Sequence, residues 1–509
     1  MAPLPDAEAT ILSGARSITR AALGARIRRA ASGYAALGVG PGDCVALLLR
    51  NDPAFLEASH AATLLGAYAV PVNWHWKPEE VAYLLADCDA KVVVAHADLL
   101  ELLAEAPAGI AVLTVPTPPE NAAAYGIPEG GPVRGEGWEE FLARHAEWSQ
   151  PPQPPRQSMI YTSGTTGRPK GVKRAPPTPA QAAARAESRR LIYGVEPGIR
   201  ALLPGPLYHS APNSFGLSSA MLADLLVIMP RFEPEEFLAL IERHRIDTSF
   251  VVPTMFVRLL RLPEAVRRRH DLSSLRHVTH AAAPCPPEVK RAMIDWWGPV
   301  IHEFYGATDL GGPTVCSSHD WLRKPGTVGR VVPGATLRIL DDEGRECPPG
   351  VPGEIFAHCP DMPDFTYHKR DDARREAERD GLISVGDVGF LDGDGYLFLC
   401  DRKRDMVISA GVNIYPAEIE AVLIGVPGVL DCAVFGIPDA EYGEALCAAV
   451  RAEPGVTEAA IRAALAARLA NFKVPRRIEF HAALPRDDSG KLLKRTLREP
   501  HWAGVGRRI

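Results

Sequence analysis

The sequence predicts an α/β protein with a large N-terminal domain of several subdomains, residues 1–403, and a small α+β C-terminal domain, residues 404–509. Three observations support this prediction. Helical and strand-like hydrophobic patterns alternate along the first part of the chain, as layered α/β folds require. The 509 residues, of which 46% are hydrophobic, are enough for more than one domain. After Arg404 the pattern changes to a compact unit of alternating helices and strands.

The elements of the large domain can be read in order from hydrophobic period and turn residues. Residues 116–137 are rich in Pro and Gly and predict irregular structure, and residues 151–155 predict a stiff proline-rich linker. The expected elements are helices at 16–37, 53–66 and 234–244, and strands at 43–49, 91–95, 225–229 and 248–252.

The small domain shows its own sequence of elements. Pro416 suits the first turn of a helix, and the carboxylates of Glu418 and Glu420 oppose the N-terminal end of the helix dipole. The expected elements are helices at 416–424 and 457–469 and strands at 429–436 and 477–481.

Composition excludes several classes of protein. The net charge of −6 and the isoelectric point near 6.2 indicate no basic surface for nucleic acid or anionic lipid. The cysteines number nine and include no CxxC pair, so neither a disulfide framework nor a zinc site is predicted. No secretory signal and no apolar run long enough for a membrane span is visible, so a cytoplasmic location is expected.

The segment 161–171, YTSGTTGRPKG, predicts a loop that holds phosphate. Glycines at 164, 167 and 171 permit positive φ, so that successive backbone N–H groups can converge on an anion. The side-chain donors are Thr162, Ser163, Thr165, Thr166 and Lys170, and the glycines assigned to the site are Gly164 and Gly167. A P-loop is excluded because the residue after the lysine is Gly171, not Ser or Thr. A flexible surface loop is the alternative interpretation.

This segment resembles the phosphate loop of the adenylate-forming superfamily, which includes acyl-CoA synthetases, firefly luciferase and the adenylation domains of peptide synthetases. The segment 303–309, EFYGATD, is similar to the family motif Tyr-Gly-x-Thr-Glu. The resemblance implies that Tyr305 stacks on adenine, that Thr308 contacts the α phosphate or the acyl carboxylate, and that Asp309 binds Mg²⁺ in place of the usual Glu. Thr162 is a second candidate metal ligand, and the residues Glu303, Phe304 and Gly306 are assigned to the ATP site.

Two later segments resemble the motifs that complete the nucleotide site in this family. Segment 385–389 contains Asp387, which the resemblance places on the ribose hydroxyls, and segment 399–405 contains Arg402, which it places on ribose or phosphate. Taken alone, each segment is also typical of a solvated surface turn. The segment 409–420 is similar to the family segment whose glycine, here Gly411, lets the pantetheine arm of CoA pass, and Ala410 replaces a second family glycine.

Three further segments resemble parts of the family site. The turn 485–492 would carry the catalytic lysine of adenylation, Lys491. The small residues Ala281, Ala282 and Ala283 occupy the place of a Gly/Ala-rich strand that floors the sites, with Ala281 assigned to the acyl pocket and the other two to ATP. His209 would border the acyl pocket, although a histidine there can equally be structural, and the sequence leaves both interpretations open.

The resemblance implies a carboxylic acid–CoA ligase that uses ATP, Mg²⁺ and CoA and works through an acyl adenylate. In the family the small domain rotates about the residue matching Arg404, which presents Lys491 for the first step and the Gly411 face for the second. The alternatives are a carrier-protein acyl-AMP ligase, a luciferase-like enzyme or a catalytically silent nucleotide-binding relative. No residue in the sequence decides which acid is used, and the resemblance allows a homodimer.

Overall fold

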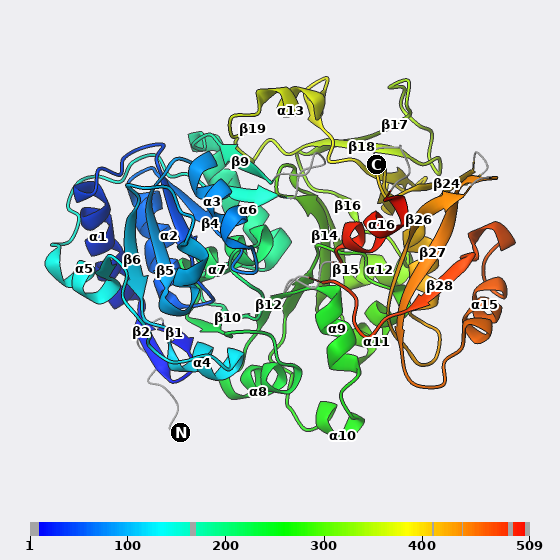
Figure 1. Cartoon of the computed structure of the whole chain (residues 1–509), viewed down its shortest axis with the longest axis horizontal. Helices are drawn as coiled ribbons and strands as arrows, with labels where there is room; N and C mark the ends of the chain where they lie inside the picture. The colour runs from blue at the N-terminus through cyan, green and yellow to red at the C-terminus, as the bar shows by residue number, and fades with distance from the viewer. Residues whose placement is uncertain (1–9, 163–168, 410–411, 440, 487–491, 504–509) are drawn as a thin grey trace. The chain divides into compact units, whose positions relative to one another are not determined.

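The chain forms two compact units built from helices and mixed sheets (Figure 1). The computed structural model describes residues 10–162, 169–409, 412–439, 441–486 and 492–503. The first unit comprises residues 1–251, 261–279 and 359–378, and the second comprises residues 252–260, 280–358 and 379–509.

The first unit contains a five-stranded parallel sheet in the order β4-β3-β5-β6-β7. Every residue of β3 is buried, as expected for a parallel strand covered on both faces. Helix α1 packs against α2 and α5. The strands are β3 Cys44–Leu48, β4 Tyr68–Pro71, β5 Ala90–His96, β6 Ala111–Val115 and β7 Glu136–Gly137, and the helices are α1 Arg20–Ala36, α2 Pro53–Leu64, α3 Pro78–Asp87, the 3₁₀ helix η1 Ala97–Leu103, α4 Pro119–Tyr125 and α5 Trp138–Arg144.

Two expectations for this region were wrong in part. The helix expected from residue 16 begins at Arg20, because the preceding residues form β2 (Arg16–Thr19), which pairs with β1 (Thr10–Ser13) across a turn containing Gly14 at φ +57°. The Thr19 side chain then caps the helix by accepting the N–H of Ala22. The stretch expected to be irregular holds α4, which begins at a proline and ends at Gly126 in the left-handed conformation.

A second sheet in the first unit contains β1, β2 and three strands parallel to β1, in the order β12-β10-β11-β1-β2. A small three-stranded sheet has the order β19-β9-β8. The remaining elements of this unit are β8 Ile160–Thr162, β9 Lys170–Arg174, α6 Pro179–Tyr193, β10 Arg200–Leu203, α7 Ser210–Leu222, β11 Leu225–Ile228, α8 Pro234–His244, β12 Thr248–Val251, α10 Glu264–Arg267, β13 His277–His280, β19 Phe365–Tyr367 and α13 Asp371–Glu376. The expected helix at 234–244 and strands at 225–229 and 248–252 are confirmed within one residue.

The part of the second unit that precedes residue 403 contains helices and antiparallel strands. Strands β14 and β15 form an antiparallel hairpin, and β16 pairs with β15. A further sheet has the order β20-β21-β18-β22-β23, with β17 paired to β18. The elements are α9 Pro253–Leu260, α11 Pro287–Trp297, β14 Ile301–Ala307, β15 Gly311–Ser317, α12 Ser318–Arg323, β16 Arg330–Val331, β17 Thr336–Leu340, β18 Gly353–His358, β20 Glu378–Arg379, β21 Leu382–Ile383, β22 Asp387–Leu391 and β23 Leu397–Arg402.

The C-terminal part of the second unit has its own five-stranded sheet in the order β25-β24-β27-β26, with β28 paired to β27. One face of this sheet packs on α14 and α15 through a core that includes Val434, Ile461 and Leu465. Helix α16, drawn in red in Figure 1, packs against β26. The elements are β24 Val407–Ser409, β25 Val412–Ile414, α14 Pro416–Leu423, β26 Val429–Asp439, β27 Gly443–Ala452, α15 Glu458–Ala466, the 3₁₀ helix η2 Asn471–Lys473, β28 Arg477–Phe480 and α16 Lys494–Trp502.

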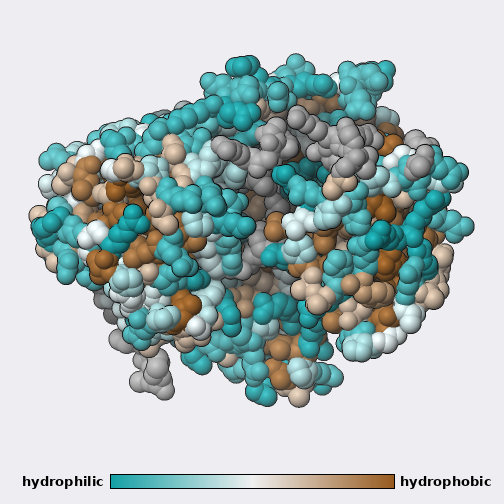
Figure 2. All heavy atoms as spheres, in the orientation of Figure 1, coloured by the Kyte–Doolittle hydropathy of each residue, from teal (hydrophilic) through white to brown (hydrophobic). Residues whose placement is uncertain are grey.

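The expected elements of the small domain are present, although their ends differ. Strand β26 extends three residues beyond the predicted end, and α15 is shorter than the predicted helix at both ends. Within the described ranges, no helix combines the length and the apolarity needed to cross a bilayer. On the face shown in Figure 2, hydrophobic residues form separate patches among hydrophilic ones.

Candidate active site

In the first unit, the predicted phosphate loop connects the two strands of a hairpin. Strands β8 and β9 are antiparallel, and Thr162 pairs directly with Lys170. The ladder therefore holds the two ends of the loop side by side, with a hydroxyl on one strand and an ammonium on the other. The Lys170 ammonium lies 5.1 Å from the ring centroid of Tyr367, a cation–π contact with β19. The other loop residues assigned to phosphate, Ser163, Gly164, Thr165, Thr166 and Gly167, lie outside the described residues.

The glycine that ends this segment has a different role from the predicted one. Gly171 was expected to adopt positive φ, but it lies in the extended backbone of β9 and is not among the residues with positive φ. A Cβ at this position would lie 2.9 Å from the ring of Tyr161, its partner in the ladder. The Tyr161 hydroxyl donates a 2.6 Å hydrogen bond to Asp87, which fixes the ring over the glycine. Gly171 is thus explained by side-chain packing.

His209, the histidine predicted to border the acyl pocket, precedes helix α7. Its backbone has an extended conformation as the N-cap residue, and its side chain is partly buried. Its ring centroid lies 4.4 Å from that of Tyr208. The ring therefore lies at the N-terminus of α7, against Tyr208.

In the second unit, three residues predicted from separate motifs come together. The Tyr305 hydroxyl donates a 2.9 Å hydrogen bond to Oδ2 of Asp387, and Nε of Arg402 lies 3.4 Å from Oδ1 of the same carboxylate. Asp387 and Arg402 are directly paired residues of β22 and β23. Burial raises the pKa of Asp387, and the positive charge of Arg402 opposes that rise. An ionised carboxylate accepts about four hydrogen bonds, so acceptor capacity remains for two ligand hydroxyls.

We expect Asp387→Asn to weaken ATP binding by about 10- to 100-fold, because hydrogen bonds to a charged acceptor contribute about 1.5–3 kcal/mol. The measurement is KM for ATP at saturating concentrations of the other substrates. Asp394→Asn, at the exposed end of the same hairpin and paired with Lys324, is the matched control and should leave KM unchanged. An unchanged KM in the Asp387 variant would contradict its assignment to the nucleotide.

The small-residue segment follows strand β13. Ala281 is 5% exposed, whereas Ala282 is exposed and has φ +74°, a region that non-glycine residues seldom adopt. A strained residue of this kind costs about 1–3 kcal/mol and is typical of functional sites. The position whose backbone favours glycine is therefore Ala282, assigned to ATP, and not Ala281, assigned to the acyl pocket. Ala283 follows as a partly buried residue.

Glu303, predicted to contact ATP, takes part in a buried ion pair that the sequence did not reveal. The Lys290 ammonium on α11 lies 2.5 Å from Oε2 of Glu303, and Nε2 of His280 lies 3.6 Å from the same oxygen. Burial raises the pKa of Glu303, with Lys290 opposing the rise, and burial lowers the pKa of His280 so far that its ring is neutral. The helical spacing of Lys290 with the buried Met293, Ile294 and Trp297 was the available signal for an interior lysine.

The turn between β14 and β15 carries the predicted phosphate and metal ligands. Phe304 and Tyr305 are buried in β14, and the turn residues are Thr308, Asp309 and Leu310. A Cβ on Gly306 would lie 2.0 Å from the carbonyl oxygen of Gly311, so only glycine allows the two strands to approach this closely. The close approach coincides with a shift in the β14–β15 pairing between residues 305 and 307. A bulge of this kind bends the strand just before the turn.

The predicted hinge lies in a tight turn between β23 and β24. The backbone N–H groups of Asp405 and Met406 both donate to the carbonyl of Arg402, and burial lowers the pKa of Arg404. The carbonyl of Arg404 accepts a hydrogen bond from Arg498 on α16. The remaining assigned residues, Ala410, Gly411 and Lys491, lie outside the described residues.

Family models match most of the chain. The model for the AMP-binding enzyme family matches residues 2–362, and the model for the AMP-binding enzyme C-terminal domain matches residues 418–491. The chain belongs to the AMP-binding enzyme family. The predicted membership of the adenylate-forming superfamily is therefore confirmed.

Relatives of this AMP-binding enzyme match over nearly their whole length. It is 34% identical to a long-chain-fatty-acid–CoA ligase, FadD13, of Mycobacterium tuberculosis, over 96% of this chain and 94% of the relative. It is 35% identical to a feruloyl-CoA synthase of an Amycolatopsis species, over 95% and 94%. Its structure superposes on ATP-bound MatB from Rhodopseudomonas palustris with a TM-score of 0.84 and 28% identity, covering 99% of this chain and 98% of MatB. The predicted fold class is thus confirmed.

Proposed function

We propose that this AMP-binding enzyme is a carboxylic acid–CoA ligase that forms an acyl adenylate from ATP and an acid and then transfers the acyl group to CoA. The proposal is supported by nearly full-length similarity to one enzyme named as a CoA ligase and to another named as a CoA synthase. The structural observation that carries it is the contact of Tyr305 and Arg402 with Asp387, because this unites three residues that the family resemblance assigned to one nucleotide.

The chemistry needs positioning and charge stabilisation and does not require a protein nucleophile. Asp387 would accept the ribose hydroxyls, and the hairpin ends at Thr162 and Lys170 would present the loop to the phosphates. The oxygen donors Asp309 and Thr162 are of the type that Mg²⁺ prefers, so these residues fit the proposed ion. Bound Mg²⁺ would offset the negative charge of the pyrophosphate leaving group. Lys491 would stabilise charge on the carboxylate and α phosphate as they approach.

The acid is left open by the relatives, since one is named for long-chain fatty acids and the other for the aromatic ferulic acid. The decisive experiment is a panel of aliphatic and aromatic acids, assayed for pyrophosphate release, AMP formation and acyl-CoA. We expect pyrophosphate release that depends on the acid and thioester formation that depends on CoA. No pyrophosphate with any acid would favour a silent relative. Pyrophosphate without thioester from CoA would favour a carrier protein as the acceptor.

We expect Asp309→Asn to weaken the use of Mg²⁺-ATP and to raise the Mg²⁺ concentration needed for half-maximal adenylation, because the substitution removes a negatively charged ligand. High Mg²⁺ should recover part of the activity. Asp309→Glu, which introduces the usual family residue, is the matched control and should work as well as the native enzyme. An unchanged Mg²⁺ dependence in the Asn variant would remove Asp309 from the metal site.

A further inference from the structure

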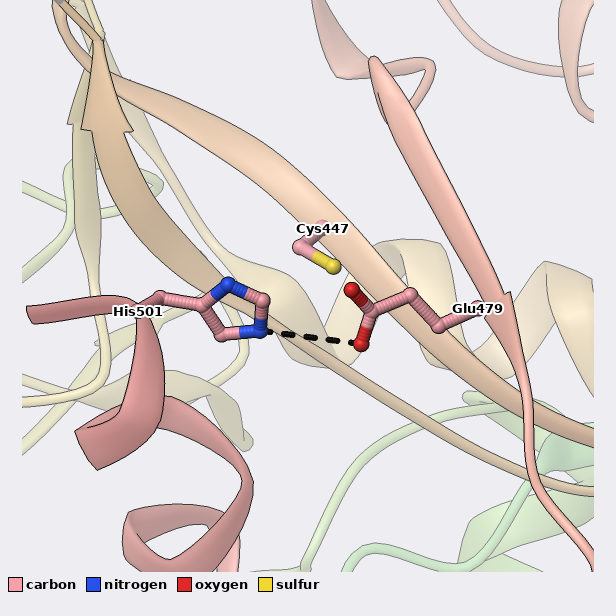
Figure 3. A group of neighbouring side chains, drawn as sticks. All are labelled: Cys447, Glu479 and His501. Atoms are coloured by element: carbon pink, nitrogen blue, oxygen red, sulfur yellow. Dashed lines mark ion pairs between the residues drawn. The ribbon is translucent and has the colours of Figure 1, made fainter.

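A cluster of three side chains suited to metal binding lies in the C-terminal part of the chain, among residues that the proposed catalytic steps do not use. Cys447 lies on β27, Glu479 on β28 and His501 on α16. Their ligand atoms, one thiol, one carboxylate oxygen and one imidazole nitrogen, all lie within 4.8 Å of one another. Figure 3 shows the three side chains converging, with the imidazole facing the carboxylate and the sulfur beside it.

Sheet register and helix packing produce this convergence. Strands β27 and β28 are parallel, with Cys447 opposite Arg477 and Ala449 opposite Glu479. Because side chains alternate along a strand, Cys447 and Glu479 project from the same face of the sheet. The ring of Phe435, on the adjacent β26, lies at a tilt to that of His501 with 5.7 Å between centroids, and the Trp502 indole donates to the carbonyl of Gly436. These contacts hold the end of α16 over the same face.

The two carboxylate oxygens of Glu479 have different neighbours: one is paired with an arginine, and the other faces two histidines. Arg477 binds Oε1 at 2.6 Å, whereas Oε2 lies 3.6 Å from Nε2 of His501 and also 3.6 Å from Nε2 of His481. A separation of 3.6 Å is too long for a hydrogen bond. It is close to the distance of about 3.4 Å between two ligands of a tetrahedral ion with bonds of about 2.1 Å. The Nε2 atom of His481 is buried without a hydrogen-bond partner in the described part of the chain, so a second imidazole nitrogen faces the same carboxylate oxygen.

We propose that Cys447, Glu479 and His501 bind a Zn²⁺ ion, with water in the fourth position. Thiolate, imidazole and carboxylate are the three ligand types that Zn²⁺ takes in proteins, whereas Mg²⁺ and Ca²⁺ select oxygen ligands. Zinc sites are recognised in a sequence by closely spaced ligand residues, and these three residues lie far apart in the chain. The sequence-based expectation of no zinc site therefore did not cover a site of this kind. The separate oxygen-based Mg²⁺ site proposed above is independent of this one.

Binding would change both the thiol and the helix. Burial raises the pKa of Cys447 to about 12, so the thiol is protonated before the ion arrives, and coordination releases that proton. Because the three ligands come from two strands and a helix, the ion would link α16 to the sheet. Helix α16 begins at Lys494, three residues after Lys491, so occupancy would also restrain the chain next to that lysine.

The test uses the full chain, freed of metal with a chelator and then titrated with Co²⁺ as a spectroscopic substitute for Zn²⁺. We expect a thiolate-to-cobalt charge-transfer band in the near ultraviolet that saturates at one equivalent and disappears when Zn²⁺ is added. Cys447→Ala should abolish the band. His501→Gln should weaken Co²⁺ binding by more than about 10-fold, since even residues outside the ligand set change metal affinity by that amount. Zn²⁺ should raise the Tm of the native chain and not that of the Cys447 variant.

The matched control is Cys432→Ala, which removes another buried cysteine of the same sheet. Cys432 belongs to the core on the opposite face from Cys447, so this variant should keep the band and its stoichiometry. His501→Gln tests the site without removing a fully buried side chain, because 16% of the His501 side chain is exposed. The absence of a band at one equivalent of Co²⁺, or an unchanged band in Cys447→Ala, would overturn the proposal.

Discussion

Lys491→Ala is expected to slow acyl-adenylate formation by at least about 10²–10³-fold while leaving thioester formation from supplied acyl-AMP nearly unchanged. The proposed first step brings a carboxylate towards the α phosphate, and a positioned cation stabilises the charge that develops there. The second step attacks an adenylate that already exists, so it does not need this cation. Pyrophosphate exchange measures the first step, and acyl-CoA formed from synthetic acyl-AMP measures the second.

Two further variants make this result specific. Lys473→Ala removes a lysine of the same domain that is paired with Glu418, and it should leave both steps intact. Gly411→Leu should give the reverse of the Lys491 result, because a bulky side chain would block the pantetheine path while acyl-AMP still forms. If the Lys491 and Gly411 variants lost both steps equally, the small domain would present one fixed site, and rotation about Arg404 would have to be abandoned.

Lys290→Met is expected to produce the largest loss of stability, about 3–5 kcal/mol in the free energy of unfolding, because it leaves the carboxylate of Glu303 buried without its partner. Urea unfolding followed by tryptophan fluorescence would measure the change. Lys324→Met is the matched control and should have little effect, since Lys324 pairs with Asp392 and Asp394 near the surface.

The loss should also depend on pH. Burial already raises the pKa of Glu303, and Lys290→Met removes the positive charge that opposes that rise. A carboxyl group whose pKa is higher in the folded state stabilises the fold below its unfolded pKa and loses that contribution as pH rises through the folded pKa. The deficit of Lys290→Met should therefore be smaller at about pH 5 than at about pH 8. An equal deficit at both values would mean that Glu303 does not remain a buried charge.

A double variant separates a structural role of Glu303 from contact with ATP. Lys290→Met combined with Glu303→Leu replaces the ion pair by apolar groups, which is often neutral for stability. We expect it to recover most of the loss seen in the single variant. If KM for ATP also stays native, Glu303 positions β14 and its neighbour Tyr305 without touching the nucleotide. If the double variant regains stability but has a raised KM for ATP, the predicted contact of Glu303 with ATP would be supported.

Sequence alone determined the features that depend on consecutive residues. Helices such as α8 and strands such as β11 were predicted nearly to the residue, because hydrophobic period and helix-terminal prolines are local signals. The order of the motifs identified the superfamily, which the family models then confirmed. Local signals failed where turn chemistry competed with composition: the hairpin turn at Gly14 delays the start of the Ala-rich helix until Arg20, and a proline start with a glycine end makes a helix of α4.

Tertiary structure decided which of these residues meet. The contact of Tyr305 with Asp387, the ion pair of Lys290 with Glu303 and the cluster around Glu479 each join elements that are separate in the chain. Such pairs are set by strand register and by which helix covers which face, and neither is encoded in a short window of sequence. The same reason explains Gly171, whose lack of a side chain could be understood only once the ring of Tyr161 was seen to lie across it.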